Sequence, residues 1–70
     1  MTKYACVLEP AADGTWSAYV PDLPGVVATG RDPDEVKTRI GEAISLHLEE
    51  LERHGQSVSP PRSQTTVVAV

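Results

Sequence analysis

The sequence is poor in the residues that reinforce small domains. Cys6 is its single cysteine, so the chain can form no internal disulfide. The two histidines, His47 and His54, have no thiolate nearby, so the ligand set of a structural zinc site is missing. A chain of 70 residues buries only about 60% of the surface that its unfolded form exposes. Without disulfides or metal, such a core usually needs self-association, and we expect a homo-oligomer, a dimer or a tetramer.

Long apolar runs are also missing. The opening residues MTKYACVLEP contain no stretch that could serve as a secretory signal or a membrane span. We therefore expect a cytoplasmic protein that does not associate with membranes. No cofactor is expected.

Basic residues are few. Six lysines and arginines stand against ten aspartates and glutamates, which gives a net charge of −4. This balance argues against a phosphate-binding surface and favours a basic protein partner over a nucleic acid. The alternative is that the charge only keeps the protein in solution.

The first half of the chain predicts three strands. Residues 3–9 and 15–20 read as strands joined by the hairpin turn PAADG, in which Asp13 forms the turn. The segment VPDLPG at 20–25 then interrupts, because proline donates no ladder hydrogen bond. A short third strand follows over 26–29.

The second half predicts a helix and a last strand. Asp32 caps a helix whose first residue is Pro33, Glu35 completes a capping box, and Gly55 ends the helix after His54. An apolar stripe of the helix faces the core: Val36, Ile40, Ala43, Ile44, Leu48 and Leu51, with His47 among them. A connector rich in serine and proline leads to TTVVAV at 65–70, which is β-branched and reads as a strand.

This order predicts a single α+β domain over residues 1–70, with a three-stranded antiparallel sheet, one long helix on one face and a C-terminal strand. One helix covers only one face of such a sheet. Depending on the register, Ala5 and Val7, or else Tyr4, Cys6 and Leu8, must point to the other face. A contiguous apolar patch is seldom left in water, so we infer that this face or a sheet edge meets another protomer or a partner.

Chemistry-bearing residues do not converge in the sequence. The acids are spread over a strand end, the turn, the proline loop and the helix, which disfavours a carboxylate metal site. His47 on the core stripe reads as a packed or interface residue, and Cys6 reads as a small buried hydrophobe. We therefore predict no catalytic and no metal-binding residue.

Six residues are candidates for contacts with a partner. Trp16 and Tyr19 point to opposite faces of one strand, so one joins the core and the other is available to a contact surface. Leu46 falls on the polar side of the helix, ringed by charge, although isolated exposed leucines are common. Asp22, Leu23 and Pro24 belong to a loop that two prolines stiffen. The alternative for the loop is that its prolines only end one strand and start the next.

Several motifs in a fixed order resemble the HicB family of small antitoxin-like proteins. These are YACVLEP, the DG turn, YVPDLPGVVATG, the DPDEV helix start and AISLHLEELERHG. The resemblance extends over nearly the whole chain. It implies a partial ribonuclease-H-like fold of the β-β-β-α-β type that lacks the nuclease carboxylates.

The resemblance also implies that the chain is an antitoxin that masks a small basic mRNA-cleaving toxin of the HicA type and has no catalysis of its own. Family members often continue into a DNA-binding domain after the last strand. This sequence stops at Val70, so no direct DNA binding is expected. The alternatives are a residual nuclease or hydrolase, and a structural or ligand-binding oligomer without a toxin partner.

Overall fold

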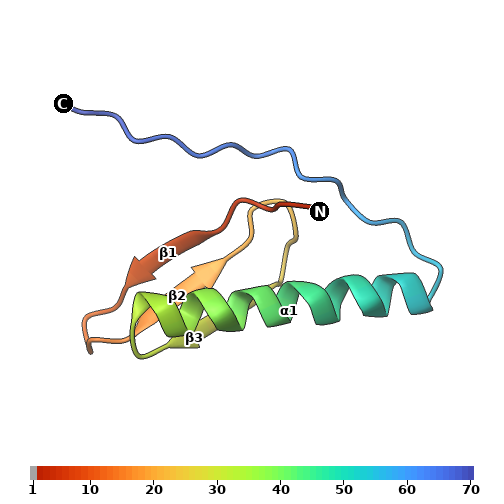
Figure 1. The fold of residues 1–70 in the computed structure, drawn as a ribbon, viewed down its shortest axis with the longest axis horizontal. Helices are drawn as coiled ribbons and strands as arrows, with labels where there is room; N and C mark the ends of the chain where they lie inside the picture. The colour runs from red at the N-terminus through yellow and green to blue at the C-terminus, as the bar shows by residue number, and fades with distance from the viewer. Residues whose placement is uncertain (1) are drawn as a thin grey trace.

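Three short strands and one long helix are the regular elements of residues 2–70, the part of the chain that this computed structural model describes. In chain order they are β1 (Val7–Pro10), β2 (Trp16–Tyr19), β3 (Val27–Gly30) and α1 (Pro33–Arg53). The strands form one antiparallel sheet in the order β1-β2-β3, and α1 lies across one of its faces (Figure 1). The predicted α+β fold is confirmed in these elements.

The sheet register decides which strand residues face the helix. Leu8 pairs with Ala18, and Ala18 pairs with Ala28, so these three side chains form one row. This row packs in or against the core under α1. Because side chains alternate along a strand, the neighbouring row points away from the helix. That second row consists of Val7, Tyr19 and Val27.

The strand β1 is shorter than the sequence predicts. Tyr19 is the last residue of β2 and pairs with Val7, so a longer β1 would place Cys6 opposite Val20 and Ala5 opposite Pro21. The ladder stops there because Pro21 has no N–H to donate. Tyr4 and Cys6 nevertheless pack against the core from the segment that leads into β1. The hairpin after β1 is as predicted: the Asp13 carboxylate accepts from the backbone N–H of Thr15 at 3.0 Å.

The proline loop consists of two turns in succession. The N–H of Leu23 donates to the carbonyl of Val20 at 3.0 Å, and the N–H of Val26 donates to the carbonyl of Leu23 at 3.2 Å. Proline is the second residue of each turn, where its fixed φ suits the geometry. Gly25 has a φ of 88°, as the third position of a type II turn requires. The spacing of three buries Val20, Leu23 and Val26 together.

Both ends of α1 follow the sequence signals. The Asp32 carboxylate accepts from the N–H of Glu35 at 2.8 Å, as an N-cap should. The return contact of the capping box is shifted by one residue, since Glu35 accepts from the N–H of Arg31. At the other end Gly55 has a φ of 67°, and the N–H of Gln56 donates to the carbonyl of Leu51 at 2.8 Å. This is a Schellman ending.

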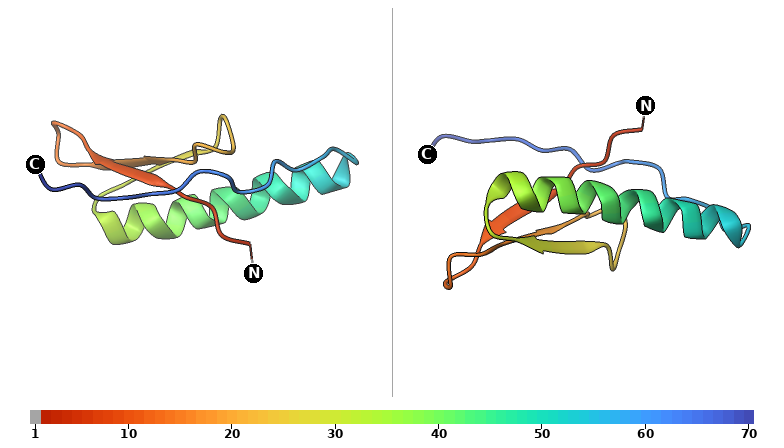
Figure 2. Two further views of the ribbon diagram at one scale, coloured as in Figure 1. Left: turned by 90° about the horizontal axis from the view of Figure 1, so that it is seen from above. Right: turned by 60° about the horizontal axis from the view of Figure 1, so that its bottom comes forward.

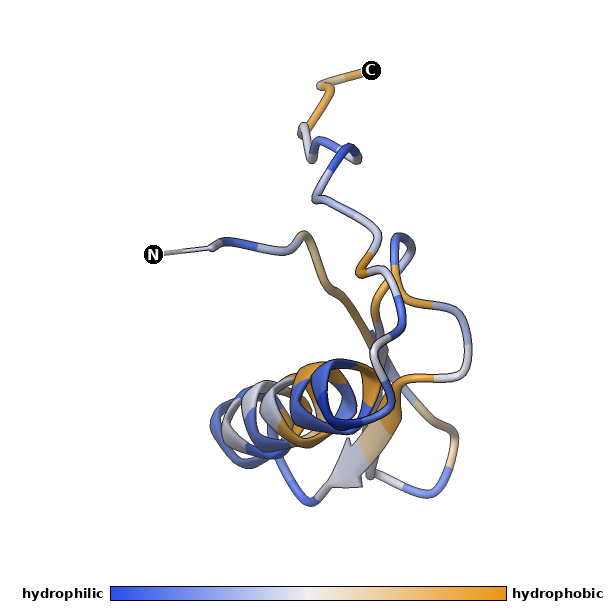
Figure 3. Cartoon of the chain, turned by 90° about the vertical axis from the view of Figure 1, so that its right-hand side faces the viewer, coloured by the Kyte–Doolittle hydropathy of each residue, from blue (hydrophilic) through white to orange (hydrophobic). Residues whose placement is uncertain are grey.

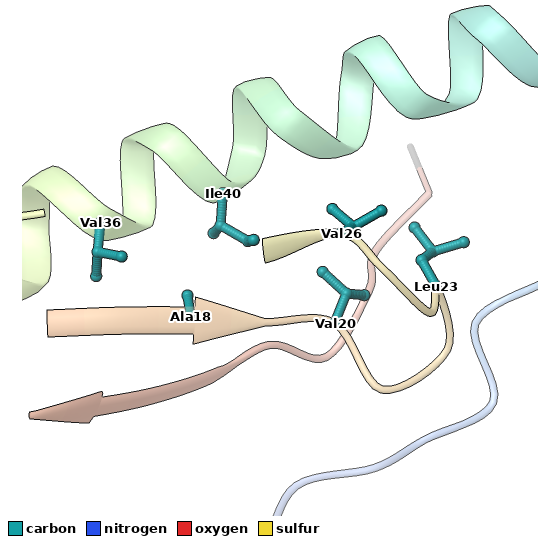
Figure 4. Close-up of a cluster of buried hydrophobic side chains, with 6 residues drawn as sticks. All are labelled: Ala18, Val20, Leu23, Val26, Val36 and Ile40. Carbon is teal, nitrogen blue, oxygen red and sulfur yellow. The ribbon is translucent and has the colours of Figure 1, made fainter. Parts of the chain in front are cut away.

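The core lies between the helix and the sheet and extends under the proline loop. Figure 4 shows Val36 and Ile40 of α1 pointing down onto β2, with the three loop residues beside them. Its fully buried members are Ala18, Val20, Leu23, Val26, Val36 and Ile40. Burying one Val, Leu or Ile contributes about 1.5–3 kcal/mol, so five such residues and one alanine make a small core. The predicted helix stripe is confirmed at Ala43, Ile44 and Leu48, which pack against it.

The predicted C-terminal strand is not part of this sheet. Residues 56–70 have no regular structure, and after α1 they turn back and run along the β1 side of the molecule (Figures 1 and 2). A β-branched sequence favours a strand only where a partner strand supplies hydrogen bonds. Along this segment, the backbone N–H groups of Arg62 and Ser63 donate instead to a side chain, the Asp22 carboxylate. The predicted likeness to ribonuclease H stays a prediction.

Candidate functional site

The residues that could carry chemistry are the histidines, the carboxylates and Cys6. Among residues 2–70, no three side chains of His, Cys, Asp or Glu come close enough together to hold a metal ion. Cys6 is partly buried, and desolvation raises the pKa of its thiol. Its Sγ lies 3.7 Å from the carbonyl oxygen of Tyr4. A raised pKa favours the protonated thiol, which is the poor nucleophile of the two forms.

The two aromatic residues of β2 divide as predicted. Trp16 packs against the core on the helix side of the sheet. Tyr19 lies on the opposite side, with its side chain 43% exposed. Tyr19 is therefore available to a partner, whereas Trp16 is only partly exposed.

Tyr19 belongs to an apolar row that crosses the whole sheet. Its neighbour on one side is Val27, which is 66% exposed, and on the other side is the partly buried Val7. The sequence predicted apolar residues on the uncovered face and left open which ones. The register answers this, because Tyr4, Cys6 and Leu8 all pack on the core side. Val27 was not singled out from the sequence, although strand alternation with Ala28 could have identified it.

The opposite side of the molecule exposes Leu46 on α1. Its side chain is 64% exposed and borders a shallow depression along the helix, lined by Thr38, Gly41, Glu42, Ser45 and Leu46. Residues three and four positions away are its neighbours on a helix surface. Three of those four neighbours are carboxylates, namely Glu42, Glu49 and Glu50. Leu46 is thus an apolar side chain within an acidic surface.

Within the proline loop, only part of the predicted contact set is exposed. Leu23, one of the predicted contact residues, is not available to a partner, since its side chain is 2% exposed and belongs to the core. The physical reason is the turn spacing, which points every third residue inward. Pro21 and Pro24 are exposed and Asp22 is partly buried. The loop therefore serves both readings given above: its turns connect two strands, and its exposed residues form a rigid surface.

Asp22 already has contacts within the chain. One carboxylate oxygen accepts from the N–H of Arg62 at 2.8 Å and of Ser63 at 2.9 Å. The other accepts from the Ser63 hydroxyl at 2.8 Å. The hydrogen bonds from Ser63 and Arg62 lower the pKa of Asp22 below its ordinary value of 3.8. These contacts, forty residues apart in the chain, carry no local sequence signal.

A second contact fixes the same C-terminal segment. The Tyr4 hydroxyl donates to the carbonyl of Ser59 at 2.7 Å. A mostly apolar groove lies between the helix end and this segment; its lining is Thr2, Tyr4, Leu48, Glu52, Gln56, Val58, Pro60 and Pro61. The segment thereby covers part of the helix end and the approach to β1.

The candidate contact residues do not form one surface. Leu46 lies on the outer side of α1, and Tyr19 lies on the outer side of the sheet, with the core between them. Asp22 and Pro24 lie in the loop that follows β2, close to Tyr19 in the chain. The molecule thus presents an acidic helix surface centred on Leu46 and a separate apolar sheet surface centred on Tyr19.

In residues 2–70, no helix has the length and apolar character needed to cross a membrane.

Comparison with known proteins identifies the family. The model of the HicB-like antitoxins of bacterial toxin–antitoxin systems matches residues 4–69. A UPF0150 protein of Archaeoglobus fulgidus is 43% identical over 47 residues, which span 67% of this chain and 68% of that protein. No solved structure matches the chain significantly. Since the family model covers almost the whole sequence, from Tyr4 to Ala69, the chain belongs to the HicB-like antitoxin family.

Proposed function

We propose that this chain is an antitoxin that binds a small basic mRNA-cleaving toxin of the HicA type and blocks it by masking, without catalysis of its own. Membership of the HicB-like antitoxin family supports the antitoxin role. The toxin would be met in the cytoplasm, where its substrate is. The proposal therefore needs a surface that suits a basic protein.

The observation that carries the proposal is the acidic helix surface around Leu46. An exposed leucine gives an interface an apolar anchor, and surrounding charges give it specificity and a fast association. Glu42 and Glu49 have no ion-pair partner among residues 2–70, so both carboxylates are open to a basic side chain. Glu50 is already paired, with Arg53 at 2.6 Å.

The basic residues of the chain are poorly placed for a nucleic acid. Arg31 contacts Glu35 at 2.8 Å, and Arg39 contacts the same carboxylate at 3.6 Å. With Arg53 bound to Glu50, three of the four arginines are engaged by carboxylates of α1. This arrangement supports a protein partner and a mode of action that needs no direct DNA binding by these residues.

Of the six predicted contact residues, Leu46 is the one that we propose as the centre of the toxin interface. Tyr19, with Asp22 and Pro24 near it, belongs to the other side of the molecule and would meet a different neighbour. Trp16 and Leu23 act through the core that they help to pack. We propose that one side of the molecule masks the toxin while the other side remains free.

The test is purification of the tagged chain from its native host. The expected result is a stoichiometric small basic protein that degrades mRNA and that the purified chain inhibits. The variant Leu46→Asp should lose this inhibition, whereas Thr38→Asp, at the other end of the same depression, should keep most of it. RNA cleavage by the chain alone, lost on chelation of metal, would instead show a residual nuclease. A chain that purifies without any basic protein would favour an oligomer without a toxin.

A further inference from the structure

The last seven residues of the chain, the tail segment 64–70, form an extended piece of chain without a partner. All three of its valines are exposed: Val67 at 98%, Val68 at 72% and Val70 at the chain end. Figure 3 shows this hydrophobic end standing away from the helix and the sheet. β-branched side chains favour a pleated, half-buried strand. The tail segment therefore has the sequence of a β-strand but has no neighbouring strand to pair with in the described chain.

The residues just before the tail segment are held on their own protomer. Tyr4 binds the carbonyl of Ser59, and Asp22 binds Arg62 and Ser63. These contacts fix the chain as far as Ser63 beside the loop that follows β2. Beyond Ser63 no hydrogen bond to the rest of the described chain remains. The point at which the tail segment leaves the protomer is therefore fixed.

The sheet has two edges, and they differ. On β3 the carbonyl of Thr29 accepts a hydrogen bond from Arg39 Nη1 at 3.0 Å, so a helix side chain already binds one backbone acceptor of that strand. In the described chain, β1 pairs only with β2, and no side chain binds its backbone. An unpaired edge strand is a template for another strand. The edge of β1 is the better acceptor.

We propose that the tail segment of one copy adds as a strand to the β1 edge of a second copy, and that the second copy returns the contact. The exchange is symmetric, so it closes a dimer with two identical strand contacts. It provides the N–H and carbonyl groups of the tail with partners and withdraws exposed valines from water. It also supplies the additional burial that a 70-residue chain with a six-residue core lacks.

The dimensions fit. The four residues of β1 span about 13 Å at about 3.3 Å per residue. The seven residues of the tail segment reach about 23 Å when extended, which is enough to leave one protomer and still cover β1 of the other. The exchange does not involve Leu46, so it goes beyond the proposed toxin binding and stands or falls separately from it.

An isotope-filtered NMR experiment on a mixed sample tests the exchange directly. Full-length chains labelled with ¹³C and ¹⁵N are unfolded and refolded with unlabelled chains. Filtered cross-peaks should connect the methyl groups of Val67 and Val68 in one copy with the amide protons of β1 in the other. Cross-peaks that occur only within a copy would show that the tail segment pairs with its own β1, and this would overturn the proposal, as would their complete absence.

A proline scan supplies the second measurement. In an added strand the N–H groups alternate between the partner and solvent. One of Val67→Pro and Val68→Pro should raise the dimer dissociation constant at least about tenfold in sedimentation, and the other much less. The controls Val67→Thr and Val68→Thr keep the N–H and the β-branch and should dimerise. A chain ending at Ser63 should be monomeric with an unchanged circular dichroism of α1; a dimer of that chain would refute the exchange.

Discussion

At the scale of single residues, Gly30 shows how closely the sheet approaches the helix. It ends β3 just before the first turn of α1, and a Cβ built at this position would lie 2.8 Å from the backbone nitrogen of Val36. It would also lie 3.1 Å from the Cα of Val36, so backbone rather than a flexible side chain would have to move. Glycine is required at position 30 because a larger side chain has no room there, and not because the backbone has a positive φ.

We therefore expect Gly30→Ala to lower the free energy of unfolding by about 1–3 kcal/mol, the usual cost of overpacking. The matched control is Gly41→Ala, in α1, where a Cβ would meet nothing within 4 Å. That change should stabilise the chain by up to about 1 kcal/mol, since alanine is the better helix former. Urea denaturation measures both variants. Equal effects of the two substitutions would contradict the close approach at Gly30.

Glu35 makes the stability of the chain depend on pH. Hydrogen bonds from the side chain and the backbone N–H of Arg31 lower its pKa from 4.5 to about 2. A depressed pKa in the folded state means that ionised Glu35 stabilises the fold above pH 4.5 and that this contribution is lost as the pH falls toward 2. Asp13 and Asp22 also have lowered pKa values, so they act in the same direction.

The variant Glu35→Gln should be less stable than the parent at pH 7, and the difference should shrink between pH 4.5 and about 2. Denaturation at pH 7, 4 and 2.5 measures this difference directly. The control Glu49→Gln changes an exposed glutamate of the same helix that has no ion-pair partner among residues 2–70. The difference in stability between Glu49→Gln and the parent should not shrink over this pH range as that of Glu35→Gln does. If the difference in stability between Glu35→Gln and the parent is the same at all three pH values, the ionised Glu35 carboxylate does not cause the pH dependence.

At the scale of elements, the proline loop and the C-terminal segment act as one unit. The loop is rigid because two turns with proline and a buried Leu23 define it. Its Asp22 carboxylate then fixes two backbone N–H groups of a segment that has no ladder of its own. Local backbone groups that are exposed and singly held are the first to open.

We expect Asp22→Ala to release this segment without unfolding the core. The amides of Arg62 and Ser63 should lose their protection from hydrogen exchange, while those of β2 and α1 keep theirs. The control Tyr4→Phe removes only the hydroxyl that binds Ser59, so it should leave the Arg62 and Ser63 amides protected. Protection of these two amides in Asp22→Ala would mean that another group holds the segment.

Elements with local signals could be predicted from the sequence, and contacts between distant segments could not. The Asp32 cap, the Gly55 ending and the Asp13 turn depend on residues within five positions of one another, so their spacing is visible in the chain. The strand expected at 65–70 has the right propensity, but a strand also needs a partner, and no sequence pattern names one. Leu23 was predicted as a contact residue for a similar reason. Its burial depends on the geometry of the two turns, which the amino-acid composition of the loop does not reveal.

At the scale of the whole molecule, one helix on three strands leaves two exposed surfaces of different character. The sheet side carries the apolar row of Val7, Tyr19 and Val27, and the helix side carries Leu46 among carboxylates. A net charge of −4 gives the chain a field that attracts basic proteins. Because the two surfaces lie on opposite sides, the proposed toxin contact on the helix side would leave the apolar row of the sheet free for a second partner.

The proposed toxin interface has an apolar anchor, Leu46, and surrounding carboxylates, and substitutions of these two kinds should have different kinetic effects. Charges at the rim of an interface mainly set the association rate, whereas an apolar anchor mainly sets the dissociation rate. The double variant Glu42→Gln with Glu49→Gln should therefore slow association with the basic toxin and weaken its dependence on salt. Leu46→Ala should leave the association rate almost unchanged and raise the dissociation rate by roughly tenfold, as loss of an anchor of about 1.4 kcal/mol would.

The control Val27→Ala changes the sheet side and should alter neither rate. Stopped-flow measurements at two salt concentrations separate these effects, and a Val27 variant that binds the toxin as poorly as Leu46→Ala would place the interface on the sheet instead.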